Sequence, residues 1–345
     1  MTRAIDLFLP WIVFPPLTAA AFYCIVVYTR LNGLGDALNA QCPVELHGNS
    51  TPFRLTYTGI ERLDGLFCIL VSTFHAAFEP KARLFLSYFM SQATPIFMFI
   101  SLESARKGIH FTLRYPVIFT FLMQVATFGA TFACYWLPFI TTGAAKAAGS
   151  MDSIITQADA EAVIFGNILG VGLPTIAMVL LLNPYVTALW QFIPVYGSLA
   201  TLLHLSFRSP KYHPQSGYKT IRANYRFLFI LDATMHMILV VSKFRTPEAL
   251  KAFLLPSLSL NTSNATSERL VLNLLQFDFV FGMGASLLAT LWFARTPRQL
   301  GLLLLWNVFG TIVVGPGAAM AAVVLWREAK LHPNDSTAVE KERKY

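Results

Sequence analysis

The chain has 345 residues, of which 55% are hydrophobic and only 13% are charged, and its mean hydropathy is +0.55. A soluble domain carries about 25% charged residues, so this composition excludes an ordinary soluble globular protein. The net charge of +8 does not indicate nucleic-acid binding, because the basic residues lie at the ends of apolar runs, as membrane topology requires. The sequence predicts an integral membrane protein that contacts lipids and binds no nucleic acid.

Nine apolar runs approach or exceed the length of about 20 helical residues that crosses a hydrocarbon core. In chain order they are Leu7–Tyr28, Leu63–Phe78, Leu84–Leu102, Tyr115–Ile140, Val163–Leu182, Tyr185–Phe207, Phe227–Phe244, Leu270–Ala294 and Leu300–Trp326. Lipid offers backbone groups no partners, so these runs are expected to be helices. We predict an all-α polytopic transmembrane bundle of about eight to nine spans, with residues 1–330 as a single domain and 331–345 as a polar tail.

The four cysteines are distributed unevenly between apolar runs and loops. Cys24, Cys68 and Cys134 lie in apolar runs, where we expect small core residues, and only Cys42 lies in a loop. Because Cys42 has no second loop cysteine to pair with, we expect no disulfide. The sequence also contains no Cys/His pattern typical of zinc and no pair of aspartate-rich motifs for magnesium, so we expect neither a metal nor another cofactor.

The sidedness of the chain in the membrane is not settled by its sequence. Sequons at Asn49, Asn261 and Asn264 indicate lumenal loops and a glycoprotein. The basic tail Lys341–Tyr345 resembles an endoplasmic-reticulum retrieval signal, which would require a cytosolic C-terminus. With nine spans the termini lie on opposite sides and these two signals conflict, while the count of Lys and Arg over alternate loops favours a lumenal N-terminus by a small margin. We expect residence in the endoplasmic reticulum.

Asp232 and His236 are the first candidates for chemistry within an apolar run. They lie four residues apart, which places both side chains on one face of a helix. An apolar surrounding favours the neutral form of an aspartate, and a buried carboxylic acid can donate a proton. His236 would then influence how readily Asp232 gives up its proton. The alternative is a polar pair that fixes the register of the helix in the bundle.

Asp278 lies between Phe277 and Phe279 in the eighth run, with no basic residue nearby in sequence. An acid in that setting is either paired across helices or functional. We therefore regard Asp278 as the second candidate for a proton donor.

Glu61 and Asp64 lie three residues apart at the start of the second run. Either could supply a second acid or the base that removes the final proton of a reaction. The alternative is a pair of interfacial charges balanced by Arg62 and Lys81.

Two other polar positions have simpler expected roles. Glu103 ends the third run beside Arg106 and Lys107, so we expect a solvated helix end with a local ion pair. Gln92, like the other single amides and histidines within runs, is expected to form an interhelical hydrogen bond.

Aromatic residues make up 14% of the chain and include 29 Phe. Some are expected at the membrane interface and others deep in the bundle. An apolar, aromatic-lined site with one or two acids suits a carbocation, because ring faces stabilise positive charge.

The segments Leu55–Val71, Phe74–Phe78 and Ser101–Gly108 resemble the small polytopic terpene cyclases of fungal meroterpenoid and indole-diterpene pathways. The resemblance implies a metal-free cyclisation in which acids in transmembrane helices protonate an epoxide or a terminal olefin of a prenyl chain. The double bonds then attack in sequence and a proton is removed at the end. The best-known members are shorter than this chain, so their catalytic acids do not align with it residue by residue.

The leading hypothesis is a membrane-bound terpene cyclase of secondary metabolism that acts on a lipophilic prenylated substrate. Asp232 or Asp278 would be its proton donor, and neighbouring membrane enzymes of the pathway would be its partners. One rival is a polytopic transporter, for which Pro174, Pro194 and the run Gly315–Gly317 could break helices, although the sequence contains no inverted repeat. The other rival is a non-catalytic membrane scaffold.

Overall fold

The computed structural model describes residues 3–43, 51–146, 154–242, 246–258 and 265–332. Throughout these residues the regular structure is helical, apart from an isolated bridge between Thr156 and Ser216. The sequons at Asn49, Asn261 and Asn264 and the basic tail Lys341–Tyr345 lie outside the described residues.

The lengths of the helices depend on where proline, glycine and polar residues interrupt the apolar sequence. They are α1 (Arg3–Phe22), α2 (Gly35–Gln41), α3 (Glu61–Ala77), α4 (Pro80–Ser104), α5 (Pro116–Ala126), α6 (Phe128–Thr141), α7 (Gln157–Asn167), α8 (Leu173–Leu181), α9 (Pro184–Trp190), α10 (Ile193–Phe207), α11 (Tyr218–His236), α12 (Pro247–Leu254), α13 (Ser267–Ala289), α14 (Pro297–Val313) and α15 (Pro316–Leu331). Stretches of π-helix connect α1 to α2 and α7 to α8, and another extends α11 to Val241.

Five helical segments are long and apolar enough to cross a membrane within the described chain. They are Leu7–Gln41, Pro80–Ser104, Gln157–Leu181, Tyr218–Val241 and Ser267–Phe293, and the bent pair α9–α10 makes a sixth if it counts as one span. The protein is therefore an all-helical integral membrane protein, as expected. The expected count of eight to nine spans is not confirmed, because the other predicted runs fold differently.

One of these runs, Tyr115–Ile140, is wrong as a single span because it folds into a hairpin. Thr127 separates α5 from α6 and has φ 73° and ψ 161°, a conformation that breaks a helix. The rings of Phe119 and Tyr135, equally distant from Thr127 in sequence, have centroids 4.9 Å apart, so the two helices run antiparallel. Each is too short to cross a bilayer, which takes about 20 residues.

The last predicted run, Leu300–Trp326, is also wrong as a single span. Gly315 has φ 90°, a conformation favoured by glycine, and Pro316 then begins α15. Trp306 Nε1 donates a hydrogen bond to the Ala319 carbonyl at 3.1 Å, so α14 and α15 form a second antiparallel hairpin. We call Thr127–Gly129 the α5–α6 tip and Val314–Gly317 the α14–α15 tip.

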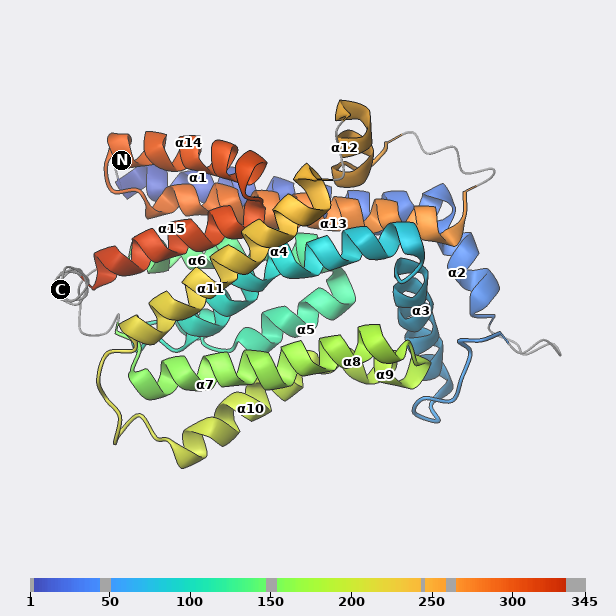
Figure 1. Ribbon diagram of the computed structural model, residues 1–345, viewed down its shortest axis with the longest axis horizontal. Helices are drawn as coiled ribbons and strands as arrows, with labels where there is room; N and C mark the ends of the chain where they lie inside the picture. The colour runs from blue at the N-terminus through green and yellow to red at the C-terminus, as the bar shows by residue number, and fades with distance from the viewer. Residues whose placement is uncertain (1–2, 44–50, 147–153, 243–245, 259–264, 333–345) are drawn as a thin grey trace.

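The two remaining runs also differ from the straight spans that the sequence predicts. The run Leu63–Phe78 forms α3, a 17-residue helix that lies crosswise to the other long helices (Figure 1). The run Tyr185–Phe207 is bent by 60° between α9 and α10, where Pro194 lies in the first turn of α10.

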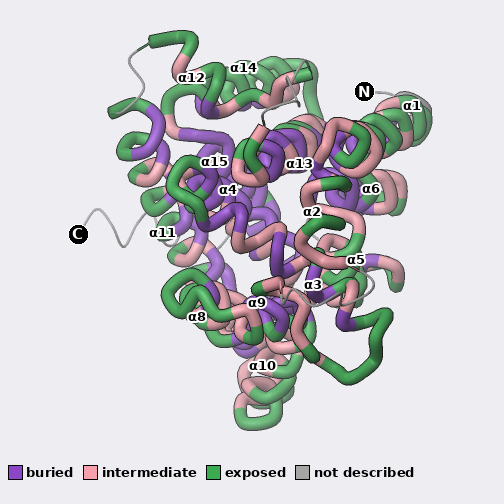
Figure 2. Tube along the Cα trace, turned by 90° about the vertical axis from the view of Figure 1, so that its right-hand side faces the viewer, coloured by how far each residue is buried: buried purple, intermediate pink, exposed green. Residues whose placement is uncertain are grey.

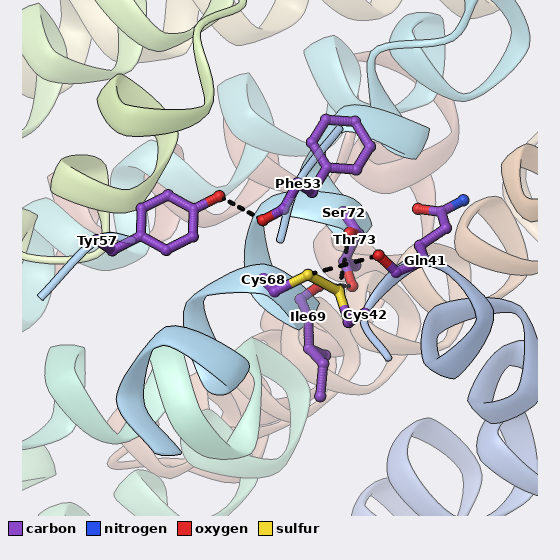
Figure 3. Close-up of a disulfide and its surroundings, with 8 residues drawn as sticks. All are labelled: Gln41, Cys42, Phe53, Tyr57, Cys68, Ile69, Ser72 and Thr73. Atoms are coloured by element: carbon purple, nitrogen blue, oxygen red, sulfur yellow. Dashed lines mark hydrogen bonds between the residues drawn. A yellow bond between two sulfur atoms is a disulfide. The ribbon is translucent and has the colours of Figure 1, made fainter. Parts of the chain in front are cut away.

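A disulfide between Cys42 and Cys68, with Cα atoms 5.9 Å apart, contradicts the expectation of unpaired cysteines (Figure 3). The expectation was wrong because Cys68 lies on the crosswise helix α3, where the end of α2 can reach it. We call this end of the bundle the disulfide end. Helices α4 and α13 both begin there (Figure 1), and their starts are joined by a hydrogen bond from Lys81 N to Glu268 Oε1 at 2.7 Å. We call the opposite end the termini end, because α1 begins and α15 ends there (Figure 1).

The buried centre of the molecule contains α4, α13 and α15, and the outer faces of α10 and α14 are exposed (Figure 2). The exposed residues of α14 include Leu302, Leu304 and Phe309. Large apolar side chains on an outer face are compatible with contact to lipid tails, which are as apolar as leucine.

Candidate functional site

Both hairpin tips reach the level of the middle of α4. Gln92 lies halfway along α4 (Pro80–Ser104), and its Oε1 accepts a hydrogen bond from Gly317 N in the α14–α15 tip at 2.8 Å. On the other side, the ring of Phe128 lies 5.2 Å from that of Phe89, one turn before Gln92. Irregular backbone at membrane depth is tolerated only where protein groups satisfy it, so the polar residues around each tip are expected to pair with its backbone.

Asp232 lies on α11 beside the α14–α15 tip and is completely buried, with 0% exposure. Neither of its carboxylate oxygens has a hydrogen-bond partner among the described residues. Its backbone carbonyl, by contrast, accepts a hydrogen bond from Gln92 Nε2 at 2.8 Å. A buried, unpaired ionised carboxylate has a very high free energy, so the neutral acid is the form compatible with this position.

His236 lies one turn after Asp232 and is also buried, but it has other partners. Its Nε2 is 3.1 Å from the carbonyl of Ile312, and its Nδ1 is 2.9 Å from the hydroxyl of Tyr88. A carbonyl only accepts, so Nε2 carries a proton, and in the neutral imidazole Nδ1 accepts the proton of Tyr88. The expected common face of Asp232 and His236 is confirmed by their common burial, but the two side chains are not hydrogen-bonded to each other.

Two glycines allow the α14–α15 tip to lie against these residues. A Cβ atom on Gly317 would lie 2.6 Å from Asp232 Oδ2 and 2.5 Å from the Gln92 carbonyl. A Cβ atom on Gly315 would lie 2.9 Å from His236 Nδ1. The tip therefore covers the unpaired acid at a distance that only glycine permits.

Asp278 lies in the middle of α13 and meets the other tip. Its Oδ1 accepts a hydrogen bond from Gly129 N at 2.5 Å, so it caps the first turn of α6. The N-terminus of a helix carries free N–H groups and a partial positive charge, and a carboxylate satisfies both. Asp278 is thus paired across helices, which is one of the two roles that its sequence position allowed.

Aromatic rings fill the space between the two tips. The ring of Phe279 lies 5.5 Å from that of Tyr88 and 5.3 Å from that of Phe89, and Phe89 also contacts Phe128. The deep aromatic residues expected from the composition therefore exist, and they separate Asp232 from Asp278.

Asp64 and Glu61 lie far from both tips, at the start of α3 in the disulfide end. Asp64 accepts hydrogen bonds from Thr58 N and Oγ1 at 2.7 and 2.8 Å, from Tyr57 N at 3.1 Å and from Gly59 N at 3.2 Å. Burial by itself raises the pKa of the Asp64 carboxyl, but these donors outweigh it and hold that pKa below its ordinary value. Glu61 is exposed. Asp64 therefore organises the loop before α3.

The expected local ion pair between Glu103 and Arg106 is confirmed, but the expectation of a solvated helix end is wrong. Glu103 is 1% exposed and binds Arg327 Nη1 at 2.7 Å and Arg106 Nε at 2.8 Å. Arg106 also pairs with Glu328, and the guanidinium of Arg327 lies 4.9 Å from the ring centroid of Phe293. Sequence reasoning missed this network because Arg327 and Glu328 are more than 200 residues away from Glu103.

Among the cavities that the described residues form, two are large, and neither of these two is lined by an acid. One, of about 590 Å³, lies between α4, α5, α7 and α10. The other, of about 600 Å³, lies on α14 and α15 and is lined by residues such as Leu302, Trp306 and Trp326. Within the described chain, no three His, Cys, Asp or Glu side chains form a group that could hold a metal ion.

Comparison with known proteins identifies the family of the chain. No curated protein sequence and no solved structure is similar enough to match it. The family model of the CtvD domain, however, matches residues 11–331, which include all the helices that carry the buried acids. The chain therefore belongs to the CtvD domain family, which is associated with terpene cyclisation in fungal meroterpenoid biosynthesis, and the resemblance stated from the sequence is confirmed.

Proposed function

We propose that this protein is a membrane-bound terpene cyclase that starts a metal-free cyclisation by donating a proton from Asp232. The observation that carries the proposal is the complete burial of the Asp232 carboxyl without a hydrogen-bond partner among the described residues. The neutral acid favoured there is a proton donor. Asp278 is the weaker candidate because its carboxylate is already engaged by Gly129 N, and Glu61 and Asp64 have no part in this step.

The reaction is an isomerisation in which no atoms are gained or lost. The Asp232 carboxyl protonates the oxygen of an epoxide on the prenyl chain, the C–O bond breaks, and the double bonds attack in sequence. Loss of a proton from the final carbocation to the Asp232 carboxylate forms the last double bond and restores the acid. Tyr88 and His236 are positioning residues. Their hydrogen bond holds α11 in place one turn after Asp232 and so fixes the position of its carboxyl.

The surroundings of Asp232 suit a carbocation. Tyr88 contacts both Phe279 and Phe253, with ring centroids 5.5 and 5.9 Å apart respectively, and ring faces attract positive charge. Burial in apolar residues also excludes the water that would quench the cation. The aromatic rings and the absence of water around Asp232 therefore match the cationic reaction proposed there.

The substrate reaches Asp232 in this proposal when the α14–α15 tip withdraws. The tip covers the carboxyl through Gly317, and α14 buries only Leu303, Asn307 and Gly310. Gly317 itself lies in the buried first turn of α15, so access requires the start of α15 to move together with α14.

The test is conversion of epoxidised farnesyl- and geranylgeranyl-aromatic compounds by yeast microsomes that contain the full chain. Liquid chromatography with mass spectrometry should detect a product of unchanged mass and new retention time. Asp232→Asn should abolish that product at equal protein level, and Glu61→Gln, an exposed acid, is the matched control that should retain it. Full activity of Asp232→Asn would refute Asp232 as the donor, and no conversion of any compound would refute the cyclase proposal for these substrates.

The two half-crossing hairpins favour one second candidate, a transporter. Transporters place the ends of broken helices at mid-membrane sites, and both tips here lie level with the middle of α4. Uptake of the same compounds into proteoliposomes, without any change in the compound, would support this function. A scaffold for neighbouring pathway enzymes, by contrast, requires that Asp232→Asn leave the flux of the pathway unchanged.

A further inference from the structure

The cavity of about 600 Å³ on α14 and α15 is a groove on the outer face of the bundle. It begins at Gln299 and Trp326, near the termini end, and reaches Phe309, which lies ten residues after Gln299 on α14. Ten helical residues span about 15 Å, which is half of a hydrocarbon core of about 30 Å. The groove therefore has the depth of one leaflet of the bilayer, counted from the termini end.

The wall of this groove is apolar and its mouth is basic. Apart from Gln299, every side chain that lines the groove is aliphatic or aromatic. Trp326 also lines a small hollow beside the groove, together with Arg295 and Lys330, and Lys330 Nζ lies 4.2 Å from the ring centroid of Trp326. Two cationic side chains therefore lie where the groove opens at the termini end.

These two cations lie beside each other rather than beside an acid. Both side chains are exposed, and the charged group that acts on the Lys330 amine is the other cation, Arg295. No Asp or Glu is among the described residues that line the groove or the hollow. Neighbouring like charges repel each other, so an anion bound between them would lower the free energy. Basic pockets between the helices of membrane proteins bind anionic lipid head groups in this way.

We propose that this groove binds one phospholipid with a net negative head group, such as phosphatidylserine. The phosphate and the additional carboxylate would pair with Arg295 and Lys330, and an acyl chain would lie along the apolar wall. Phosphatidylcholine fits the wall equally well, but its choline group brings a further positive charge to the two cations. The inference concerns binding and stands independently of the reaction proposed at Asp232.

The test measures lipid exchange at the groove, with Trp306 and Trp326 as reporters because both line it. The purified full chain is placed in phosphatidylcholine nanodiscs that contain a small fraction of brominated phosphatidylserine or brominated phosphatidylcholine, whose bromine atoms quench tryptophan fluorescence on contact. Phosphatidylserine should enter the groove about 5- to 25-fold in preference to phosphatidylcholine, as one or two basic side chains near an anionic lipid predict. The double variant Trp306→Phe/Trp326→Phe should lose this difference in quenching.

Two double variants with the same loss of charge separate the groove from the general positive charge of the termini end. Arg295→Gln/Lys330→Gln should remove the preference for phosphatidylserine while both brominated lipids still quench. Lys107→Gln/Lys211→Gln removes two exposed lysines of the same end that line neither the groove nor the hollow, and it should leave the preference unchanged. Equal quenching by the two lipids in the unchanged chain, an equal loss of preference in both double variants, or a preference that survives Arg295→Gln/Lys330→Gln would each overturn the proposal.

A separate observation concerns sidedness. The disulfide Cys42–Cys68 lies at one end of the bundle, and disulfides persist in oxidising compartments such as the lumen of the endoplasmic reticulum. Of the 20 Lys and Arg side chains that the structure describes, 13 lie in the half toward the termini end. The other seven are Arg30, Arg54, Arg62, Lys81, Arg83, Lys251 and Arg269. Cytosolic ends are enriched in Lys and Arg.

We infer that the disulfide end faces the lumen and that the termini end faces the cytosol. Because α1 begins and α15 ends at the same end, the conflict between a lumenal loop before α3 and a cytosolic C-terminal tail disappears. It arose from the assumption of nine spans, an odd number, which places the termini on opposite sides. The same orientation places the mouth of the α14–α15 groove in the cytosolic leaflet, where anionic lipids are concentrated.

Two exposed lysines at opposite ends of α4 test this orientation. Lys81 lies in the first turn of α4 and Lys107 lies just after its end. In sealed microsomes a membrane-impermeant maleimide should label Lys107→Cys at once and Lys81→Cys only after permeabilisation, with the unmodified chain as the background for Cys24 and Cys134. The reverse pattern, or equal labelling of both variants, would overturn the orientation.

Discussion

The two aspartates at the middle of the bundle occupy similar places but differ in their partners. Each lies on a long helix beside the tip of a hairpin that goes only part of the way across. At the α5–α6 tip, Asp278 caps the new helix through Gly129 N. At the α14–α15 tip, the corresponding N–H of Gly317 goes to Gln92 instead, which leaves the carboxyl of Asp232 unpaired.

This difference separates acids that hold the structure from an acid that is available for chemistry. A paired buried carboxylate lowers the free energy of the fold, so its loss should appear as a loss of stability. An unpaired buried acid raises that free energy and is retained when it has a function.

The largest effect is expected on turnover, from Asp232→Asn. Removal of a positioned general acid lowers the rate by about 10²- to 10⁴-fold, while the melting temperature of the solubilised protein should hold or rise because no hydrogen bond is lost. Product formation and thermal unfolding are measured on the same preparation. A fall in melting temperature together with full turnover would place Asp232 among the structural acids.

Glu103→Gln should produce the largest loss of stability, of about 3–5 kcal/mol, because it leaves Arg327 and Arg106 buried with too little negative charge. Thermal unfolding in detergent measures the effect, and exposed Glu61→Gln is the control, expected within about 0.5 kcal/mol of the unchanged chain. Equal melting temperatures for the two variants would contradict the role of the network.

Asp278→Ala should reduce stability by about 1–3 kcal/mol, because it leaves the N–H of Gly129 unpaired, and it should retain turnover per folded molecule. Asp278→Asn should cost less, since an amide oxygen still accepts. The measurement is turnover normalised to the folded fraction. If Asp278→Asn abolished turnover with the fold intact, the contrast between the two tips would be lost.

Gly317→Ala tests the close cover over Asp232. The added methyl group would meet Asp232 and Gln92, and overpacking of this kind destabilises by about 1–3 kcal/mol. Gly301→Ala on the same hairpin is the control, because nothing lies within 4 Å of its added Cβ. The difference between the two melting temperatures is the measurement, and no difference would show that the tip is loosely packed.

The smallest effect concerns Asp64 and, in the unchanged chain, appears only in acid. Its folded pKa is held below the ordinary value by the donors of Thr58, Tyr57 and Gly59. The contribution to stability is therefore complete above the unfolded pKa of about 3.9 and is lost as the pH falls through the lower folded pKa. Proteolysis of residues 53–60 should accelerate below about pH 3.9. Asp64→Asn should make the loop equally sensitive at neutral pH.

Several features of the site could be predicted from the sequence because they depend on composition and local spacing. Asp232 and Asp278 were identified as exceptional because an acid within an apolar run is exceptional whatever its partners are. Gln92 was correctly expected to bridge helices. The roles of the two aspartates could not be separated, because the deciding donors, Gly129 N and Gly317 N, come from distant parts of the chain.

The sequence by itself determined that the chain is helical and lies in a membrane, because the hydrophobicity of each segment is a sum over its own residues. It did not determine how many runs cross, because hydropathy does not reveal whether a run such as Leu300–Trp326 continues past Gly315 or turns back. The tertiary structure alone decided the disulfide, the Glu103 network and the pairing of each buried acid. Those depend on contacts between residues far apart in the chain, which arise only when the helices have packed.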